Sequence, residues 1–268
     1  GAVGEEPANG QRRHGQGFAE EAARSASVVN HARFGQAIAG VGGIGPLADG
    51  GKVAASLPGP PGRRRKFPNA ELEPMKLLAI DTALAACSAA LFAGCRVVAE
   101  RRAEMERGQS EALMPMVADV LAAGREHCPG GFADLALIAV TVGPGAFTGV
   151  RIGLASAGAM AAAADLPLVG LTTLEVVAAA QAPAGLPILV ALDAKRSDVY
   201  CQLFDVDLAP LCEPRAMLPA AIPSLLTGGP VALAGDGSEP VAAALRAAGI
   251  SFQRLSGHDR PEAPVLAR

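Results

Sequence analysis

Aromatic side chains are scarce in this sequence. Only 3% of its 268 residues are Phe, Tyr or Trp, and Trp does not occur. Hydrophobic residues nevertheless make up 50% of the chain, so a sizeable core can form, filled mainly by Ala, Leu and Val. Small core residues let helices pack closely against their neighbours. The length allows one large domain or two small ones.

Paired metal ligands are also lacking. The five cysteines form no CxxC pair, and their scatter through apolar runs indicates reduced thiols used as small core residues. From residue 75 onward the histidines are His127 and His258, which share neither helical nor loop spacing with another ligand. The sequence therefore predicts no dedicated metal site. No nucleophile sits in a recognisable elbow, although a triad whose members meet only in space stays open.

Long apolar runs and a strong charge of one sign are missing as well. We expect no membrane span, because no apolar run reaches the length of about 20 residues that a span needs, and the N-terminus lacks a signal-peptide core. A soluble, cytoplasmic protein is predicted. The net charge is −3: residues 1–74 carry 9 basic and 7 acidic side chains, whereas residues 75–268 carry 14 and 19. An acidic body argues against direct binding of nucleic acid by this chain alone.

Residues 1–74 differ from the rest in composition. Gly, Pro, Ala and charged residues dominate, and only Phe18 to Ile38 has a weak helical pattern. The basic run from Pro58 to Lys66 is typical of a solvated linker, with a nucleic-acid tether as the alternative. A clean strand pattern follows Met75 directly. We therefore expect residues 1–74 to be a disordered or non-native extension, and the native protein to begin at Met75.

The remaining sequence predicts strands and helices in two similar series. Strand patterns cover residues 76–80, 87–93, 96–101, 135–142, 167–170, 188–192, 199–204 and 231–234. An apolar stripe at helical spacing consists of Leu113, Met116, Val117, Val120 and Leu121, and Gly124 ends that helix. Further helices are expected over residues 149–164, 173–181 and 240–248.

A short internal likeness suggests a duplication. The segment from Leu78 to Ala83 resembles that from Val190 to Lys195, and each places an Asp, Asp81 or Asp193, at the end of a buried strand. Two copies of a βββαβα unit form the α/β, actin-like (ASKHA, ribonuclease H-like) two-lobed fold. We expect the first lobe over residues 75–182 and the second over residues 183–268.

The most specific stretch is the glycine-rich segment from Val142 to Gly153, between a buried strand and an Ala-rich helix. Gly143 and Gly145 allow positive φ, Pro144 fixes a corner, and Thr148 can cap the helix. Free N–H groups at such a helix start favour an anion, while close packing of helix on strand is the alternative. The candidate residues for an anion or nucleotide contact are Asp81, Gly143, Gly145, Thr148, Gly149 and Asp193, with Asp236 bordering the same cleft.

Several segments together closely resemble the bacterial TsaB (YeaZ) family. They are residues 75–82, 107–111, 143–154 and 192–194, and the resemblance covers about Met75 to Arg268. It implies a non-catalytic subunit of the machinery that makes N6-threonylcarbamoyladenosine in ANN-reading tRNAs. The resemblance further implies that the chain pairs with and activates the catalytic subunit TsaD, recruits the ATPase TsaE, and meets tRNA through the complex.

Other expectations follow from that resemblance. Family members commonly carry His where this chain has Gln109, which strengthens the non-catalytic interpretation. No cofactor is expected to bind strongly to this chain, with ATP or ADP left open for the complex, and a homodimer left open for the chain alone. Family members usually continue beyond Arg268, so a shortened second lobe is expected.

The partner interface is our inference from the helical patterns. We assign it to Leu113, Met116, Val117 and Val120 and to the small-residue face of Gly153, Ala157 and Ala161, although such a face usually packs inside its own domain. The alternative function is a nucleotide-dependent phosphotransferase or glycoprotease-like hydrolase on the same fold.

Overall fold

The computed structural model describes residues 75–94 and 96–266. These residues belong to one of the two units into which the chain divides, residues 67–268. The expected extension over residues 1–74 and its weak helix at 18–38 lie outside the described residues, so the native start at Met75 stays a prediction.

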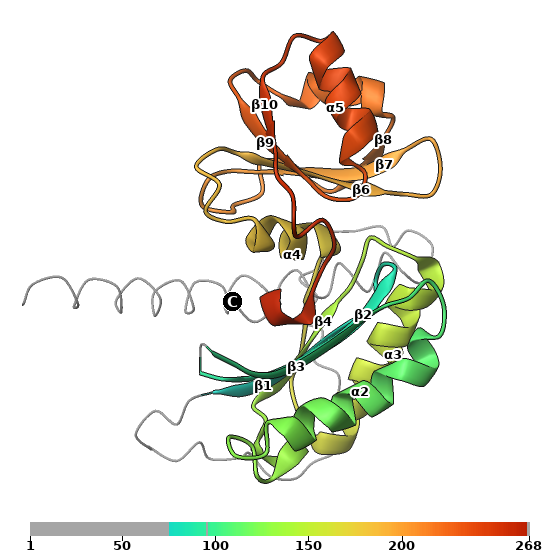
Figure 1. The fold of residues 1–268 in the computed structure, drawn as a ribbon, viewed down its shortest axis with the longest axis vertical. Coiled ribbons are helices and arrows are strands. Elements are labelled where there is room, and N and C mark those ends of the chain that lie inside the picture. Colours follow the sequence, from blue (N-terminus) through green and yellow to red (C-terminus); the bar gives the residue numbers. More distant parts are fainter. Residues whose placement is uncertain (1–74, 95, 267–268) are drawn as a thin grey trace, which may run out of the picture. The chain divides into compact units, whose positions relative to one another are not determined.

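A mixed five-stranded sheet forms the first lobe. Its strands are β1 (Lys76–Asp81), β2 (Ala86–Ala93), β3 (Arg96–Glu104), β4 (Leu137–Thr141) and β5 (Leu168–Leu171). Their order is β3-β2-β1-β4-β5, with β1 antiparallel to β2 and parallel to β4. Helices α2 (Gln109–Ala123) and α3 (Phe147–Ala164) cover one face, as Figure 1 shows, and the short 3-10 helix η1 (Gly131–Asp134) connects α2 to β4.

The second lobe repeats this strand order. Its strands are β6 (Ile188–Asp193), β7 (Val199–Phe204), β8 (Arg215–Met217), β9 (Val231–Ala234) and β10 (Phe252–Arg254), in the order β10-β9-β6-β7-β8. Again the first strand lies centrally, antiparallel to the second and parallel to the fourth. The 3-10 helix η2 (Pro219–Leu225) takes the place that α2 has in the first lobe, and α5 (Ser238–Ala247) follows β9. The predicted actin-like fold with two βββαβα units is confirmed.

Two short helices each pack against the sheet of the other lobe. Helix α4 (Thr173–Ala180) follows the first sheet, yet Leu174, Val177 and Ala178 pack in one core with residues of β6 and β9. The 3-10 helix η3 (Ala263–Val265) follows the second sheet, yet Ala263 and Val265 pack against β1 and β2. The core of the second lobe thus includes α4, which follows the first sheet in sequence. The core of the first lobe includes η3, which follows the second sheet.

The small-residue composition explains the layers. The core between the first sheet and α2–α3 contains Leu, Ile, Val, Ala and Met side chains, and its largest fully buried members are aliphatic. The predicted end of α2 at Gly124 is confirmed. The short strands β8 and β10 and the 3-10 helices were not predicted, because segments of three to seven residues are too short to show a hydrophobic period.

Helix α3 requires one correction about apolar runs. By length and composition alone its 18 residues could cross a membrane, contrary to the expectation that no apolar run is long enough to do so. In the structure α3 packs on the first sheet and buries Ala157, Met160 and Ala161 there. A core helix of a globular lobe explains its composition.

Candidate functional site

A row of polar side chains crosses the first sheet where β1 ends. Asp81 on β1 lies opposite Ser88 on β2, which in turn lies opposite Arg102 on β3. Thr141, the last residue of β4, donates a hydrogen bond from Oγ1 to Asp81 Oδ1 at 2.5 Å. Since β1 and β4 are parallel, their C-terminal ends bring these groups to the same edge of the sheet.

Asp81 is fully buried in this row. Its Oδ1 also accepts a hydrogen bond from the Ala83 N–H at 3.2 Å, whereas Oδ2 has no hydrogen-bond partner. Burial raises the pKa of Asp81 from 3.8 to about 7, because desolvation of the carboxylate outweighs the opposing effects of Thr141, Ala83 and Arg102. The carboxyl group can therefore hold a proton near neutral pH.

The glycine-rich turn docks against the residues that follow Asp81. The Ala146 N–H donates to the Ala83 carbonyl at 2.7 Å, and Thr82 Oγ1 donates to the Gly149 carbonyl at 2.7 Å. A Cβ atom at Gly145 would overlap the Ala83 carbonyl, and one at Gly149 would overlap the Thr82 carbonyl. These glycines permit close approach of two backbones, which favours the packing interpretation; an anion contact stays a prediction.

Two details of the predicted turn are corrected. Positive φ occurs at Gly143 (φ 99°) but not at Gly145, whose lack of a side chain serves the close contact instead. Helix α3 begins at Phe147, so its N-cap is Ala146 and no side chain caps it. Thr148 lies inside the first turn and is exposed, because the helix starts two residues earlier than expected.

Asp193, the counterpart of Asp81 in the second lobe, has a different environment. Its Oδ1 accepts from the Lys195 N–H at 2.7 Å, and its Oδ2 pairs with Lys195 Nζ at 2.8 Å. These two hydrogen bonds lower the pKa of the Asp193 carboxyl. The Asp193 N–H donates to Asp236 Oδ1 at 3.0 Å, so Asp236 lies at this strand end, while its place beside a nucleotide cleft stays a prediction.

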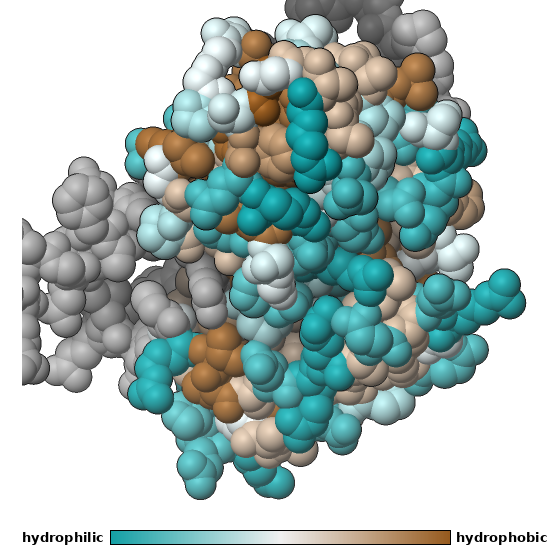
Figure 2. All heavy atoms as spheres, turned by 45° about the horizontal axis from the view of Figure 1, so that its top comes forward, coloured by the Kyte–Doolittle hydropathy of each residue, from teal (hydrophilic) through white to brown (hydrophobic). Residues whose placement is uncertain are grey.

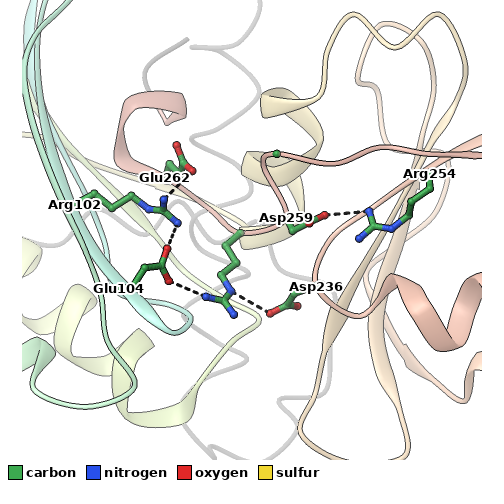
Figure 3. A pocket seen from close by; sticks show the side chains of 8 residues that line it. Arg102, Glu104, Asp236, Arg254, Asp259 and Glu262 are labelled. Carbon is green, nitrogen blue, oxygen red and sulfur yellow. Dashed lines mark hydrogen bonds and ion pairs between the residues drawn. The ribbon is translucent and has the colours of Figure 1, made fainter.

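A charged cavity lies between the end of β3, the loop after β9 and the segment that returns to the first lobe (Figure 3). Its volume is about 490 Å³. It is lined by Arg102, Glu104, Asp236, Arg254, Gly257, Asp259, Arg260 and Glu262. Figure 2 shows hydrophilic residues gathered in a band across the middle of one face, between more hydrophobic areas.

The cavity charges are paired with one another. Arg260 Nη1 lies 2.8 Å from Glu104 Oε2, and Arg260 Nε lies 3.6 Å from Asp236 Oδ2. Arg102 Nη2 lies 2.5 Å from Glu104 Oε1, and Arg102 Nη1 lies 3.5 Å from Glu262 Oε1. No local sequence pattern indicates this cluster, because its central pair, Arg260 and Glu104, is 156 positions apart.

The predicted nucleotide contacts do not fit a metal-bound nucleotide in this arrangement. Asp81 is fully buried, so its carboxylate does not face a cleft. Asp193 is reachable but is bound to Lys195. Among the described residues, no group of three or more His, Cys, Asp or Glu side chains is placed to hold a metal ion.

The predicted partner interface is largely wrong. Six of its seven residues are buried within the first lobe: Leu113, Val117, Val120, Gly153, Ala157 and Ala161. Only Met116 is partly exposed. The stripe on α2 and the small face of α3 both point into the core, because these are the faces that let the helices pack on the sheet.

Other residues of the two helices face outward. On α2, Met114 is 47% exposed, with Ala118 and Ala122 exposed at successive four-residue steps. On α3, Ala155 and Ala159 are exposed. At the start of α3, Phe147 is 73% exposed and the guanidinium of Arg151 lies 3.2 Å from its ring centroid. The outer side of this helix pair therefore presents apolar and small side chains.

Gln109, the first residue of α2, is largely buried. Its side-chain amide donates to the Met105 carbonyl at 3.2 Å. This contact fixes the turn that enters α2, so the residue at this position has a structural role.

Several of the known proteins that this chain resembles carry names that refer to threonylcarbamoyladenosine in tRNA. A family model described as "tRNA N6-adenosine threonylcarbamoyltransferase" (TsaD) matches residues 98–214. The protein of Escherichia coli named "tRNA threonylcarbamoyladenosine biosynthesis protein TsaB" is 38% identical over 128 residues, which are 47% of this chain and 53% of that protein. The Bacillus subtilis protein of the same name is 35% identical over 130 residues, 48% of this chain and 55% of that protein. The chain thus spans about half the length of the curated relatives it matches.

Solved structures agree with the fold. A Pseudomonas aeruginosa protein described as similar to the peptidase YeaZ is 26% identical, with a TM-score of 0.62. The match covers 72% of this chain and 88% of that one. The structure described as YeaZ from the same organism is 24% identical with a TM-score of 0.59 and the same coverage, and this match concerns the fold alone.

Proposed function

The chain belongs to the TsaB (YeaZ) family, and on this premise we propose that it takes part in the biosynthesis of N6-threonylcarbamoyladenosine in tRNA as a non-catalytic subunit. The observation that carries the proposal is the 38% identity to the E. coli protein TsaB over 128 residues. In this proposal the chain binds and activates TsaD. It meets tRNA and the ATPase TsaE only within that complex.

The burial of the polar row supports a role without chemistry of its own. Asp81 is shielded from solvent, and Gln109 is tied to a backbone carbonyl. Neither group is placed to exchange a proton with an external substrate. The chain would act by contributing binding free energy that favours the competent conformation of TsaD.

We assign the partner surface to the outer side of α2 and α3, in place of the buried residues predicted from the sequence. Met114 and Phe147 are exposed apolar anchors, and the small exposed side chains of Ala155 and Ala159 on α3 would allow a partner helix to approach closely. Arg151 brings one positive charge to this apolar surface, where its guanidinium group stacks on the Phe147 ring in a cation–π contact.

Reconstitution of tRNA modification tests the function. Purified TsaD and TsaE of the source organism, with the remaining enzymes of the pathway, should modify tRNA far faster with this chain than without it. If the chain alone modified tRNA or hydrolysed ATP, the alternative of a phosphotransferase or hydrolase on this fold would replace the proposal.

Paired substitutions test the surface. Met114→Asp or Ala155→Arg should abolish co-elution with TsaD while leaving the melting temperature nearly unchanged, because both positions are exposed. Val206→Asp is a matched control, since Val206 is 53% exposed in the second lobe. Ala157→Arg should instead unfold the first lobe, since Ala157 is fully buried. Unchanged pairing in both surface variants, with folding intact, would contradict the assignment.

A further inference from the structure

The segment from Leu255 to Glu262, here called the strap, carries the chain from the second sheet back to the first. It begins directly after β10 and ends at η3. At its far end, the Ala263 N–H donates to Ser88 Oγ at 3.0 Å, a buried hydrogen bond to the polar row of the first sheet. The end of the strap is therefore held next to Ser88, the neighbour of Asp81 in the polar row.

Arg260 occupies the middle of the strap and contacts both lobes. One guanidinium nitrogen binds Glu104 at the end of β3, in the first lobe, at 2.8 Å. Another lies 3.6 Å from Asp236, in the loop between β9 and α5 of the second lobe. A single planar side chain thus joins two carboxylates that belong to different lobes.

The two carboxylates are themselves held in place. Glu104 also pairs with Arg102, which reaches Glu262 on the strap at 3.5 Å. Asp236 accepts the backbone N–H of Asp193 at the end of β6. One anchor of Arg260 is therefore held on β3 and the other at the end of β6, so a change at Arg260 affects a contact in each lobe.

The remaining side chains of the cavity do not form this bridge. Arg254 pairs with Asp259 at 3.0 Å and also donates to backbone carbonyls of β9 and the loop after it. Those contacts lie within the second lobe and the strap. Among the ion pairs of residues 75–94 and 96–266, the two of Arg260 alone join the loop after β9 to β3 through one side chain.

We propose that Arg260 is an electrostatic latch that holds the two lobes closed across the charged cavity and keeps the strap seated on the polar row of the first sheet. The Arg260 side chain lines the charged cavity between the lobes. Opening requires both ion pairs to be exchanged for solvent or for charged groups of a ligand or partner. This inference is independent of the proposed pairing with TsaD.

Hydrogen exchange on the full chain tests the latch, with the Ala263 amide as the reporter. Ion pairs that are partly exposed stabilise weakly, so Arg260→Gln should speed exchange of this amide by about three- to tenfold. Raising NaCl from about 0.05 M to about 0.5 M should speed exchange in the wild type and change it little in the variant, because salt screens the latch. Arg260→Lys, which keeps the charge but not the planar fork, should be intermediate.

Two outcomes would overturn the proposal. One is exchange of the Ala263 amide that is unchanged in Arg260→Gln. The other is acceleration of all slow amides by the same factor, including those of β6, because this would show general destabilisation. Arg125→Gln, which removes the same charge from the exposed turn after α2, is the control and should leave the Ala263 amide unaffected.

Discussion

The buried carboxyl of Asp81 should make folding stability depend on pH in a direction opposite to that of most acidic groups. Its pKa is about 7 in the folded protein, whereas the ordinary pKa of an exposed aspartate is 3.8. The folded state therefore binds the proton more tightly. Stability from this group is fully present below pH 3.8 and is lost as the pH rises through 7.

The size of the effect follows from the shift. At about 1.4 kcal/mol per pKa unit, ionisation of Asp81 should cost about 4 kcal/mol of unfolding free energy above pH 7. Since domains are typically stable by about 5–15 kcal/mol, this is a large share. Asp81→Asn removes the ionisation and keeps an acceptor for the Thr141 hydroxyl. The variant should match the wild type near pH 4 and exceed it in stability near pH 8.

Urea denaturation at several pH values measures this difference. With an m-value of about 2 kcal/mol/M, the midpoint of Asp81→Asn should lie about 2 M above that of the wild type at pH 8. Asp119→Asn, on the exposed side of α2, is the control for a lost charge and should follow the wild-type curve. Parallel pH dependence in Asp81→Asn and the wild type would refute the account of the polar row.

Two further predictions concern local structure. Gly145→Ala should destabilise the fold by about 1–3 kcal/mol, because the new Cβ overlaps the Ala83 carbonyl. Gly158→Ala is the control and should be neutral or stabilising, because its Cβ meets no neighbouring atom within 4 Å. A lower melting temperature for Gly158→Ala than for Gly145→Ala would contradict the close packing of the turn on Ala83. Thr172→Ala should cost about 1 kcal/mol, because Thr172 and Glu175 form a capping box at the start of α4, and equal urea midpoints for variant and wild type would count against it.

The sequence contains enough to predict the sheets but not the contacts between them. Strands such as β1 and β6 are continuous apolar runs that end in Asp, so their positions and the duplication follow from local pattern. The stripe on α2 correctly marks a buried face; the error was to assign that face to a partner. A hydrophobic period shows which side of a helix is covered but not by what.

The polar contacts that the sequence does not predict join residues that are far apart in the chain. Arg260 and Glu104 are 156 residues apart, and Ala263 and Ser88 are 175 apart. Nothing in either segment indicates its partner. The packing of η3 on β1 and β2 is likewise a contact that only the tertiary structure shows.

The exchange of α4 and η3 between the lobes affects how the polypeptide can be divided. A cut at the predicted boundary, after residue 182, would leave β6 and β9 without Leu174, Val177 and Ala178, and would leave β1 and β2 without Ala263 and Val265. Each fragment would then present a bare aliphatic surface to water and should aggregate or fail to fold when produced alone. Recombining the fragments should restore a native assembly, because each supplies the piece that the other has lost.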